Sequence, residues 1–210
     1  MIFAYRPGER RRFRSIGAPL AALLFLGLTA CFPTSKHPVA ANEGNVLPAI
    51  FGGIWEGAMG DGPATIIFME RDDSALSPHR IKGLLIRHHE DRPALNEGWL
   101  AFEVDVAQLR GEMILSVLLT QMDGRPTGDD EKGYYLFRVK RTGDTYRLVG
   151  LDDLVTAELV DRGALDGTVT QSFGLPSVKI TSGGRDLRAF LMNADLDELF
   201  SEPFASFTRR

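Results

Sequence analysis

The sequence predicts a mainly β protein of the α+β class: a single antiparallel barrel or strongly curved sheet with two to three short helices near the C-terminus. Two observations lead to this fold class. Several short segments alternate apolar and polar residues and are separated by turn residues, as in all-β sandwiches and barrels. Only two stretches, both in the C-terminal third, repeat apolar residues at helical spacing.

The cleanest alternation spans residues 99–106, where every second residue is apolar. Leu100, Phe102, Val104 and Val106 therefore share one face of a predicted strand. Gly143 and Asp144 predict a hairpin turn between two further strands, because glycine adopts positive φ at little cost. The other predicted strands are 64–70, 79–89, 112–120, 134–141, 145–149 and, at the end of the chain, 203–208.

Two helices are predicted after the last hairpin. The first begins at Asp152 and Asp153, where the helix dipole favours acidic side chains, and ends at residues 162–163. The second spans about residues 185–193 and carries an apolar stripe. A short extra turn is predicted to begin at Asp195.

Residues 1–30 differ from the rest of the chain. Five arginines precede an apolar run from Ile16 to Leu28, which is 13 residues long. A membrane-spanning helix needs about 20 apolar residues, whereas the apolar region of a signal peptide is this short. Residues 1–30 are therefore predicted to be a secretory signal peptide.

The only cysteine, Cys31, stands directly after this apolar run. The sequence Leu28-Thr29-Ala30-Cys31 resembles the bacterial lipobox. This resemblance implies cleavage between Ala30 and Cys31 and attachment of lipid, including an acyl chain such as palmitate, to Cys31. Phe32, rather than aspartate, follows the cysteine, which implies an outer-membrane protein facing the periplasm. The alternatives are a small buried cysteine or an ordinary cleavage site beside a chance cysteine.

Without residues 1–30 the chain has 180 residues and a net charge of −8. An acidic domain is repelled by anionic surfaces, so membrane attachment is expected to depend on lipid, and a general nucleic-acid binder is excluded. Residues 31–48 contain Pro33, Pro38 and Pro48 without any periodicity and are predicted to be the lipidated N-terminus and a flexible tether. Residues 49–210 are predicted to be one β-rich globular domain.

The opening Gly52-Gly53-Ile54-Trp55-Glu56-Gly57 resembles that of lipocalins, in which the tryptophan plugs the base of a barrel. The order of motifs between Tyr134 and Phe200 resembles a group of uncharacterised bacterial envelope proteins with lipocalin-like barrels. The resemblance covers about residues 50–208. It implies a lipocalin-like fold and no reaction, and the two predicted helices depart from a plain lipocalin.

Residues that could carry chemistry match no known signature. His88 and His89 are adjacent on a predicted strand and so point to opposite faces, and with His79 they match no zinc spacing. Acidic residues 129–131 lack the spacing of a calcium loop. No metal or cofactor is therefore expected. Ser116 or Ser172 with His89 would be the components of a hydrolase, but no nucleophile motif supports this.

Three aromatic residues, Trp55, Trp99 and Tyr135, are candidates for lining a ligand pocket, although aromatic residues at strand spacing more often pack in a core. The sequence therefore predicts a lipid-anchored, non-catalytic module that holds a small apolar ligand or docks an envelope protein. A ligand cup would need an interior of several hundred Å³. The alternatives are a structural lipoprotein of envelope assembly, with an exposed apolar patch, and an uncharacterised hydrolase.

Overall fold

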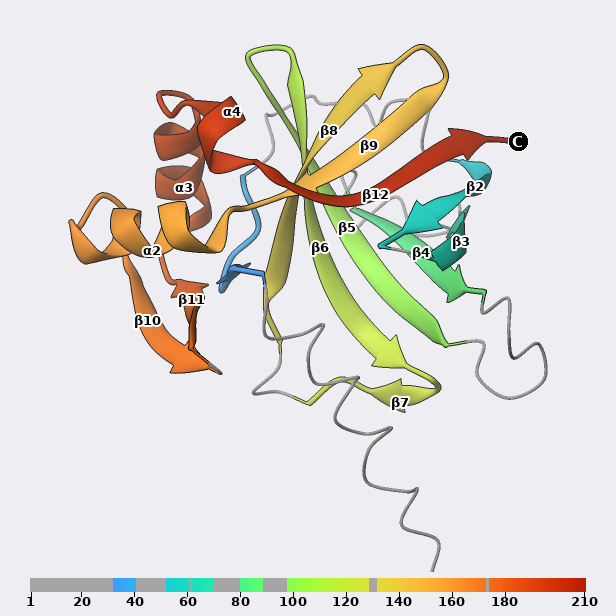
Figure 1. Ribbon diagram of the computed structural model, residues 1–210, viewed down its shortest axis with the longest axis horizontal. Coiled ribbons are helices and arrows are strands. Elements are labelled where there is room, and N and C mark those ends of the chain that lie inside the picture. The colour runs from blue at the N-terminus through green and yellow to red at the C-terminus, as the bar shows by residue number, and fades with distance from the viewer. Residues whose placement is uncertain are drawn as a thin grey trace, which may run out of the picture. The chain divides into compact units, whose positions relative to one another are not determined.

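A computed structural model describes residues 32–40, 52–60, 62–69, 80–88, 98–128, 132–172 and 174–210. Eight antiparallel strands close into a barrel and follow one another around it in chain order, which confirms the predicted fold class (Figure 1). The strands are β2 (Gly53–Met59), β3 (Gly62–Met69), β4 (Arg80–Arg87), β5 (Trp99–Leu109), β6 (Glu112–Met122), β8 (Tyr134–Thr142), β9 (Thr145–Gly150) and β12 (Glu202–Arg209).

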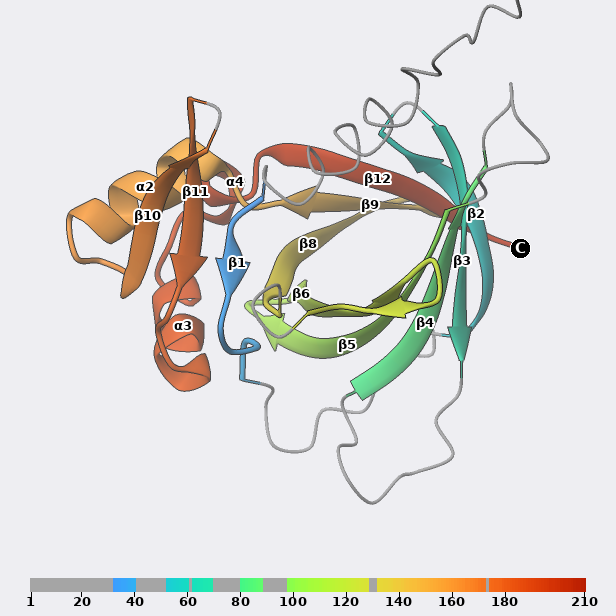
Figure 2. The same ribbon diagram turned by 90° about the horizontal axis from the view of Figure 1, so that it is seen from below.

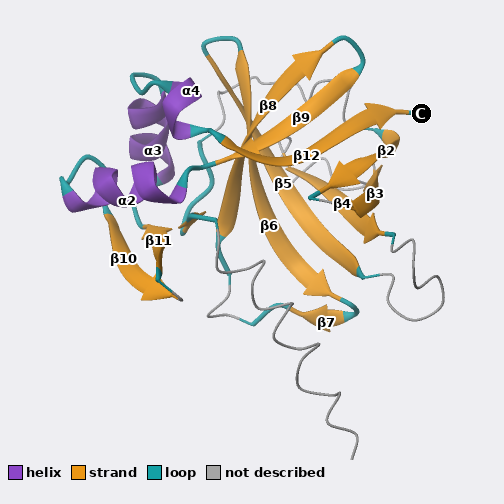
Figure 3. Ribbon diagram, viewed as in Figure 1, coloured by secondary structure: helices purple, strands orange, loops and turns teal. Residues whose placement is uncertain are grey.

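An insertion between β9 and β12 contains the helices, which gather on one side of the barrel (Figure 3). Its elements are α2 (Asp153–Asp161), β10 (Gly167–Ser172), β11 (Leu175–Ile180), α3 (Gly184–Leu191) and α4 (Leu196–Leu199). The two predicted helices and the extra turn are confirmed as α2, α3 and α4. Strand β2 and the hairpin of β10 and β11 are additions to the predicted strands, as is the short β7 (Arg125–Pro126), which pairs with β6.

The alternation of β5 divides its side chains between two cores. Phe102, Val104 and Val106 are buried inside the barrel, as predicted. Ala107 and Leu109 point to the outer face and are buried in a second core together with side chains of the insertion. The C-terminal half of β5 therefore contributes buried apolar side chains to both cores.

The last strand carries a β-bulge that explains its irregular pattern. Phe204 and Phe207 are three residues apart, a spacing that would place them on opposite faces of a regular strand. The pairing of β12 with β9 shifts register between Pro203 and Ala205. The extra residue turns both rings towards the interior, where Phe207 is buried and Phe204 packs against the same cluster.

Closure of the barrel depends on Gly57 in β2. This residue pairs with Phe207 of β12, and the two strands approach so closely that a Cβ atom at position 57 would lie 1.9 Å from the carbonyl oxygen of Ser206. The obstacle is main chain, which cannot rotate away as a flexible side chain could. Only glycine therefore permits β12 to complete the barrel at this position.

Residues 32–40, here called the strap, are packed into the folded domain, although the domain was predicted to start at residue 49. Within the strap, β1 (Thr34–Ser35) pairs antiparallel with β8 and parallel with β11, so it joins the barrel to the insertion (Figure 2). Ser35 is fully buried and Val39 is 2% exposed. The prediction of a flexible tether over residues 31–48 is thus wrong for 32–40, which belong to the folded domain.

Polar contacts hold the end of the strap. The main-chain N–H of Val39 donates to Ser116 Oγ at 3.0 Å, and that of Ala40 donates to the carbonyl of Gly184 at 3.1 Å. Arg188 of α3 in turn donates to the carbonyl of Ala40 at 3.0 Å. These bonds satisfy the main-chain groups that a short segment without long strand partners would otherwise leave unpaired.

A buried arginine connects the insertion to the barrel wall. Arg138 of β8 donates to Glu112 at 2.9 Å and to Asp197 of α4 at 2.8 Å. The hydrogen bond from Arg138 lowers the pKa of the Glu112 carboxyl. Because Arg138 is buried, losing either carboxylate would leave part of its charge uncompensated.

Two neighbouring carboxylates at the start of α2 have opposite effects on the stability of the fold. Asp152 accepts hydrogen bonds from the N–H groups of Leu154 and Val155 and so caps the helix. Asp153, by contrast, has a buried carboxylate oxygen with no hydrogen-bond partner among the described residues. Burial, with smaller contributions from Asp152 and Glu202, raises the pKa of Asp153 to about 6.

We predict that Gly57→Ala destabilises the domain by about 3 kcal/mol, because the new Cβ would collide with the main chain of β12. Chemical denaturation followed by circular dichroism measures the change. Gly52→Ala is the matched control, since a Cβ at position 52 meets no atom within 4 Å. Equal stability of the two variants would show that the barrel closes without this constraint.

We predict that Asp153→Asn stabilises the domain at pH 7.5 by about 1 kcal/mol, allowing for partial exposure to solvent. The pKa of Asp153 is raised from 3.8 to about 6, so folding favours the protonated carboxyl. Its stabilising contribution is complete below pH 3.8 and is lost as the pH rises through 6. The difference between wild type and variant in denaturation midpoint should therefore shrink as the pH falls to 4. A difference independent of pH would contradict this origin.

Candidate functional site

Side chains fill most of the barrel interior. The ring of Phe102 lies against Gly83, where a Cβ would come within 2.4 Å of it, and Leu115 and Phe137 are also buried inside. A cavity of about 40 Å³ remains between these side chains. Its walls belong to six strands and consist of Trp55, Ile66, Phe68, Leu115, Val139, Tyr146, Leu148 and Phe207. The described residues thus form a small cavity in place of a cup of several hundred Å³.

One end of the barrel is closed by an aromatic cluster. Phe32, the first residue of the strap, packs edge-on against Phe204 with ring centroids 5.5 Å apart, and its centroid lies 6.3 Å from that of Phe137. Its ring also covers Gly150, where a Cβ would lie 2.6 Å from it. Since Gly150 is the last residue of β9, the cluster closes the end of the barrel from which the insertion leaves.

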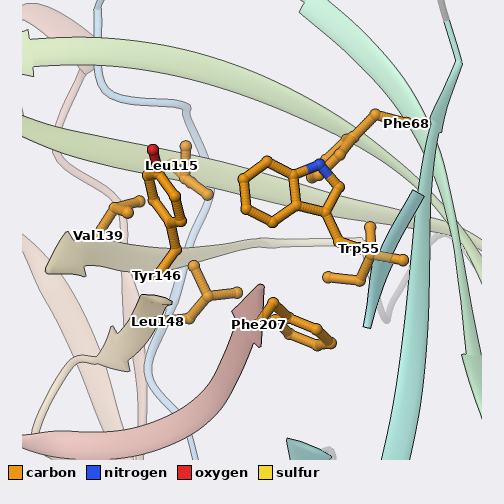
Figure 4. A pocket seen from close by; sticks show the side chains of 8 residues that line it. Trp55, Phe68, Leu115, Val139, Tyr146, Leu148 and Phe207 are labelled. Atoms are coloured by element: carbon orange, nitrogen blue, oxygen red, sulfur yellow. The ribbon is translucent and has the colours of Figure 1, made fainter. Parts of the chain in front are cut away.

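The cavity lies towards the other end, near the beginning of β2 and of β9. Trp55 and Tyr146 meet across it at right angles, with ring centroids 4.9 Å apart (Figure 4). Phe68 stands edge-to-face with the same indole at 6.5 Å. Such T-shaped pairs are favourable beyond the area that they bury, so they fix the orientation of the indole.

The indole nitrogen of Trp55 is the unusual atom of this site. Trp55 is 4% exposed, and its Nε1 has no hydrogen-bond partner among the described residues. In Figure 4 the nitrogen lies on the side of the indole next to Phe68. A buried donor without an acceptor costs about 1–3 kcal/mol. The lining of the cavity is apolar, and an apolar cavity does not hold a water molecule that could accept the bond.

The three aromatic residues predicted to line a pocket have different positions. Trp55 lines the cavity, whereas Tyr135 packs against the interior cluster without being one of the cavity's lining residues. Trp99 lies on the opposite face of β5 from Phe102, so it points away from the interior. Tyr146 was missed, although it begins an alternation with Leu148 directly after the predicted hairpin turn.

The residues proposed for a hydrolase are not assembled in the part of the chain that the structure describes. Ser116 is fully buried beneath the strap, and its hydroxyl accepts the N–H of Val39. His88 contacts Thr65, with 2.9 Å between Nε2 and Oγ1. His79, His89, the side chain of Ser172 and residues 129–131 lie outside the described residues.

The charged groups beside the strap form an ion-pair network. Arg80 donates to Asp105 at 2.7 Å and to Glu103 at 3.3 Å, and its contact with the Tyr134 hydroxyl is 3.4 Å. The hydrogen bond to Asp105 raises the pKa of Arg80, and burial raises the pKa of Tyr134. These groups satisfy one another, so the network is a structural feature of the outer wall. No group of three or more potential metal ligands occurs among the described residues.

Cys31 and the predicted signal segment lie outside the described residues. Within the described part of the chain, no helix has the length and apolar character needed to cross a membrane. Comparisons of the chain with protein-family models, with curated protein sequences and with solved structures found no match.

Proposed function

We propose that this protein is a lipid-anchored, non-catalytic docking module of the bacterial cell envelope, attached to the outer membrane through lipid on Cys31 and exposed to the periplasm. The observation that best supports this proposal is the position of the strap. Phe32, the residue after the proposed lipidation site, packs against Phe204, and the strap is bound to both barrel and insertion. A lipid on Cys31 would therefore hold the barrel by its closed end.

The outer face of β2 and β3 is the surface that favours docking. Ile54 and Ile67 are direct cross-strand partners on this face, and Met69 follows two residues later on the same side. Ile54 is 43% and Met69 44% exposed. By contrast, outer side chains of β5, β6 and β8 such as Leu109, Ile114 and Leu136 are buried in the second core with the strap and the insertion.

We predict that Cys31→Ser abolishes incorporation of a fatty-acid label and leaves the leader uncleaved, because serine lacks the thiol that accepts lipid. The measurement is metabolic labelling with an alkyne fatty acid in a Gram-negative host, with fractionation of the membranes. Val39→Ala is the control, since it loosens the strap but retains the only cysteine and should remain labelled and membrane-bound. Normal maturation and sedimentation of Cys31→Ser with the membranes would refute the anchor.

We predict that a photo-crosslinking side chain at Ile54 captures one defined envelope protein in intact cells, and that the same probe at Leu154 does not. Leu154 is a matched control because it is also apolar and exposed, at 63%, but lies on α2. The product should disappear in Cys31→Ser, since the module would no longer be held at the membrane. A product that is equal at both positions, or independent of Cys31, would contradict docking through this face.

A further inference from the structure

We propose that β10 pairs with β10 of a second copy of this chain, so that the two hairpins join into one antiparallel sheet across a twofold axis. Strand β10 is one end of the sheet order, and among the described residues its only strand partner is β11. In Figure 2, β11 and β1 lie between it and the barrel. The proposal depends neither on the lipid anchor nor on docking through β2 and β3.

The pairing of β10 with β11 determines which main-chain groups face the open edge. The carbonyl of Asp166 accepts the N–H of Thr181 at 2.7 Å, so every second pair from there along the hairpin shares hydrogen bonds. Gln171 and Pro176 fall on a pair without such bonds, which agrees with the missing N–H of proline. The residues whose N–H and C=O groups point away from β11, towards the open edge, are Gly167, Val169 and Gln171.

Strand β10 lacks the features that normally prevent an edge strand from pairing. Its sequence, Gly-Thr-Val-Thr-Gln-Ser, has no charged residue and no proline, and its register with β11 is regular over all six residues. The other end of the sheet order, β7, consists of Arg125 and Pro126 alone, and its short length, its charge and its proline all discourage pairing. The edge of β10 is therefore open to another strand.

This edge is complementary to itself, which favours a second copy as the partner. A twofold axis at Val169 places this residue opposite its own copy and Gly167 opposite Gln171 of the second copy, so all three outward-facing residues exchange hydrogen bonds in one register. Thr168 then lies opposite Thr170 of the second copy, and no like charges meet. The axis is perpendicular to the sheet, so both copies of α2, which packs on β10 and β11, cover the same face of the joined sheet.

Charged substitutions test this register, because Thr168 and Thr170 are exposed and would face one another only between copies. The full chain is studied by sedimentation equilibrium in density-matched detergent, and the wild type is expected to have twice the mass of one chain. Thr168→Glu combined with Thr170→Glu should weaken self-association about tenfold, because carboxylates would oppose one another. The matched variant, Thr168→Glu with Thr170→Lys, places opposite charges across the interface and should restore the dimer.

Amide hydrogen exchange separates loss of the dimer from loss of the hairpin. In the variant with two glutamates, the outward-facing N–H groups of Val169 and Gln171 should exchange about tenfold faster than in the wild type. Those of Thr168 and Thr170, which are bonded to β11, should remain protected, and a glutamate at position 168 faces Lys179 within the hairpin. A monomeric wild type, with or without an extended segment of another protein at this edge, would overturn the proposal. So would a dimer that survives two glutamates, or one that the Glu–Lys pair fails to restore.

Discussion

The close contact between β2 and β12 is the constraint on which the rest of the structure depends. These strands are the first and last of the barrel, and their pairing converts a curved sheet with two free edges into a closed wall. Gly57 permits this approach because it has no side chain. Closure also dictates the course of the chain, since the insertion leaves after β9 and must return to the position where β12 can meet β2. Gly150 and Glu202 are direct partners, so the insertion leaves and returns at one place, and with the strap it covers outer side chains of β5, β6 and β8.

The sequence was most informative where a single physical pattern dominates. The alternation of residues 99–106, the turn at Gly143 and the acidic start of α2 each follow from local chemistry, and the structure confirms them. The strap was misjudged because three prolines in a segment without periodicity are typical of a tether. Its order comes from partners more than 75 residues away, such as Ser116, which local sequence does not reveal. The hairpin of β10 and β11 was also missed, because only a few of its side chains, such as Val178 and Ile180, are apolar and buried.

The candidate site could be predicted only in part. Trp55 was identified by its position in an opening that resembles lipocalins, and Tyr146 could have been found from the alternation of β9. The size of the cavity could not be predicted from the sequence, because the cavity is the space that remains after side chains from six strands have packed. Whether an indole N–H meets an acceptor likewise depends on the rings around it. The barrel thus has one end closed by Phe32 and a small apolar cavity towards the other.

The placement of β1 between β8 and β11 has a mechanical consequence. A force applied to residue 31 would act along β1, which is hydrogen-bonded on both sides and followed by the bonds of Lys36, Val39 and Ala40. Such a load shears several hydrogen bonds together, so it resists extension more strongly than a hairpin that unzips one bond at a time. Tension from an anchor would also reach the barrel through β8 and the insertion through β11 simultaneously. A load that enters at β1 is therefore shared by the barrel and the insertion.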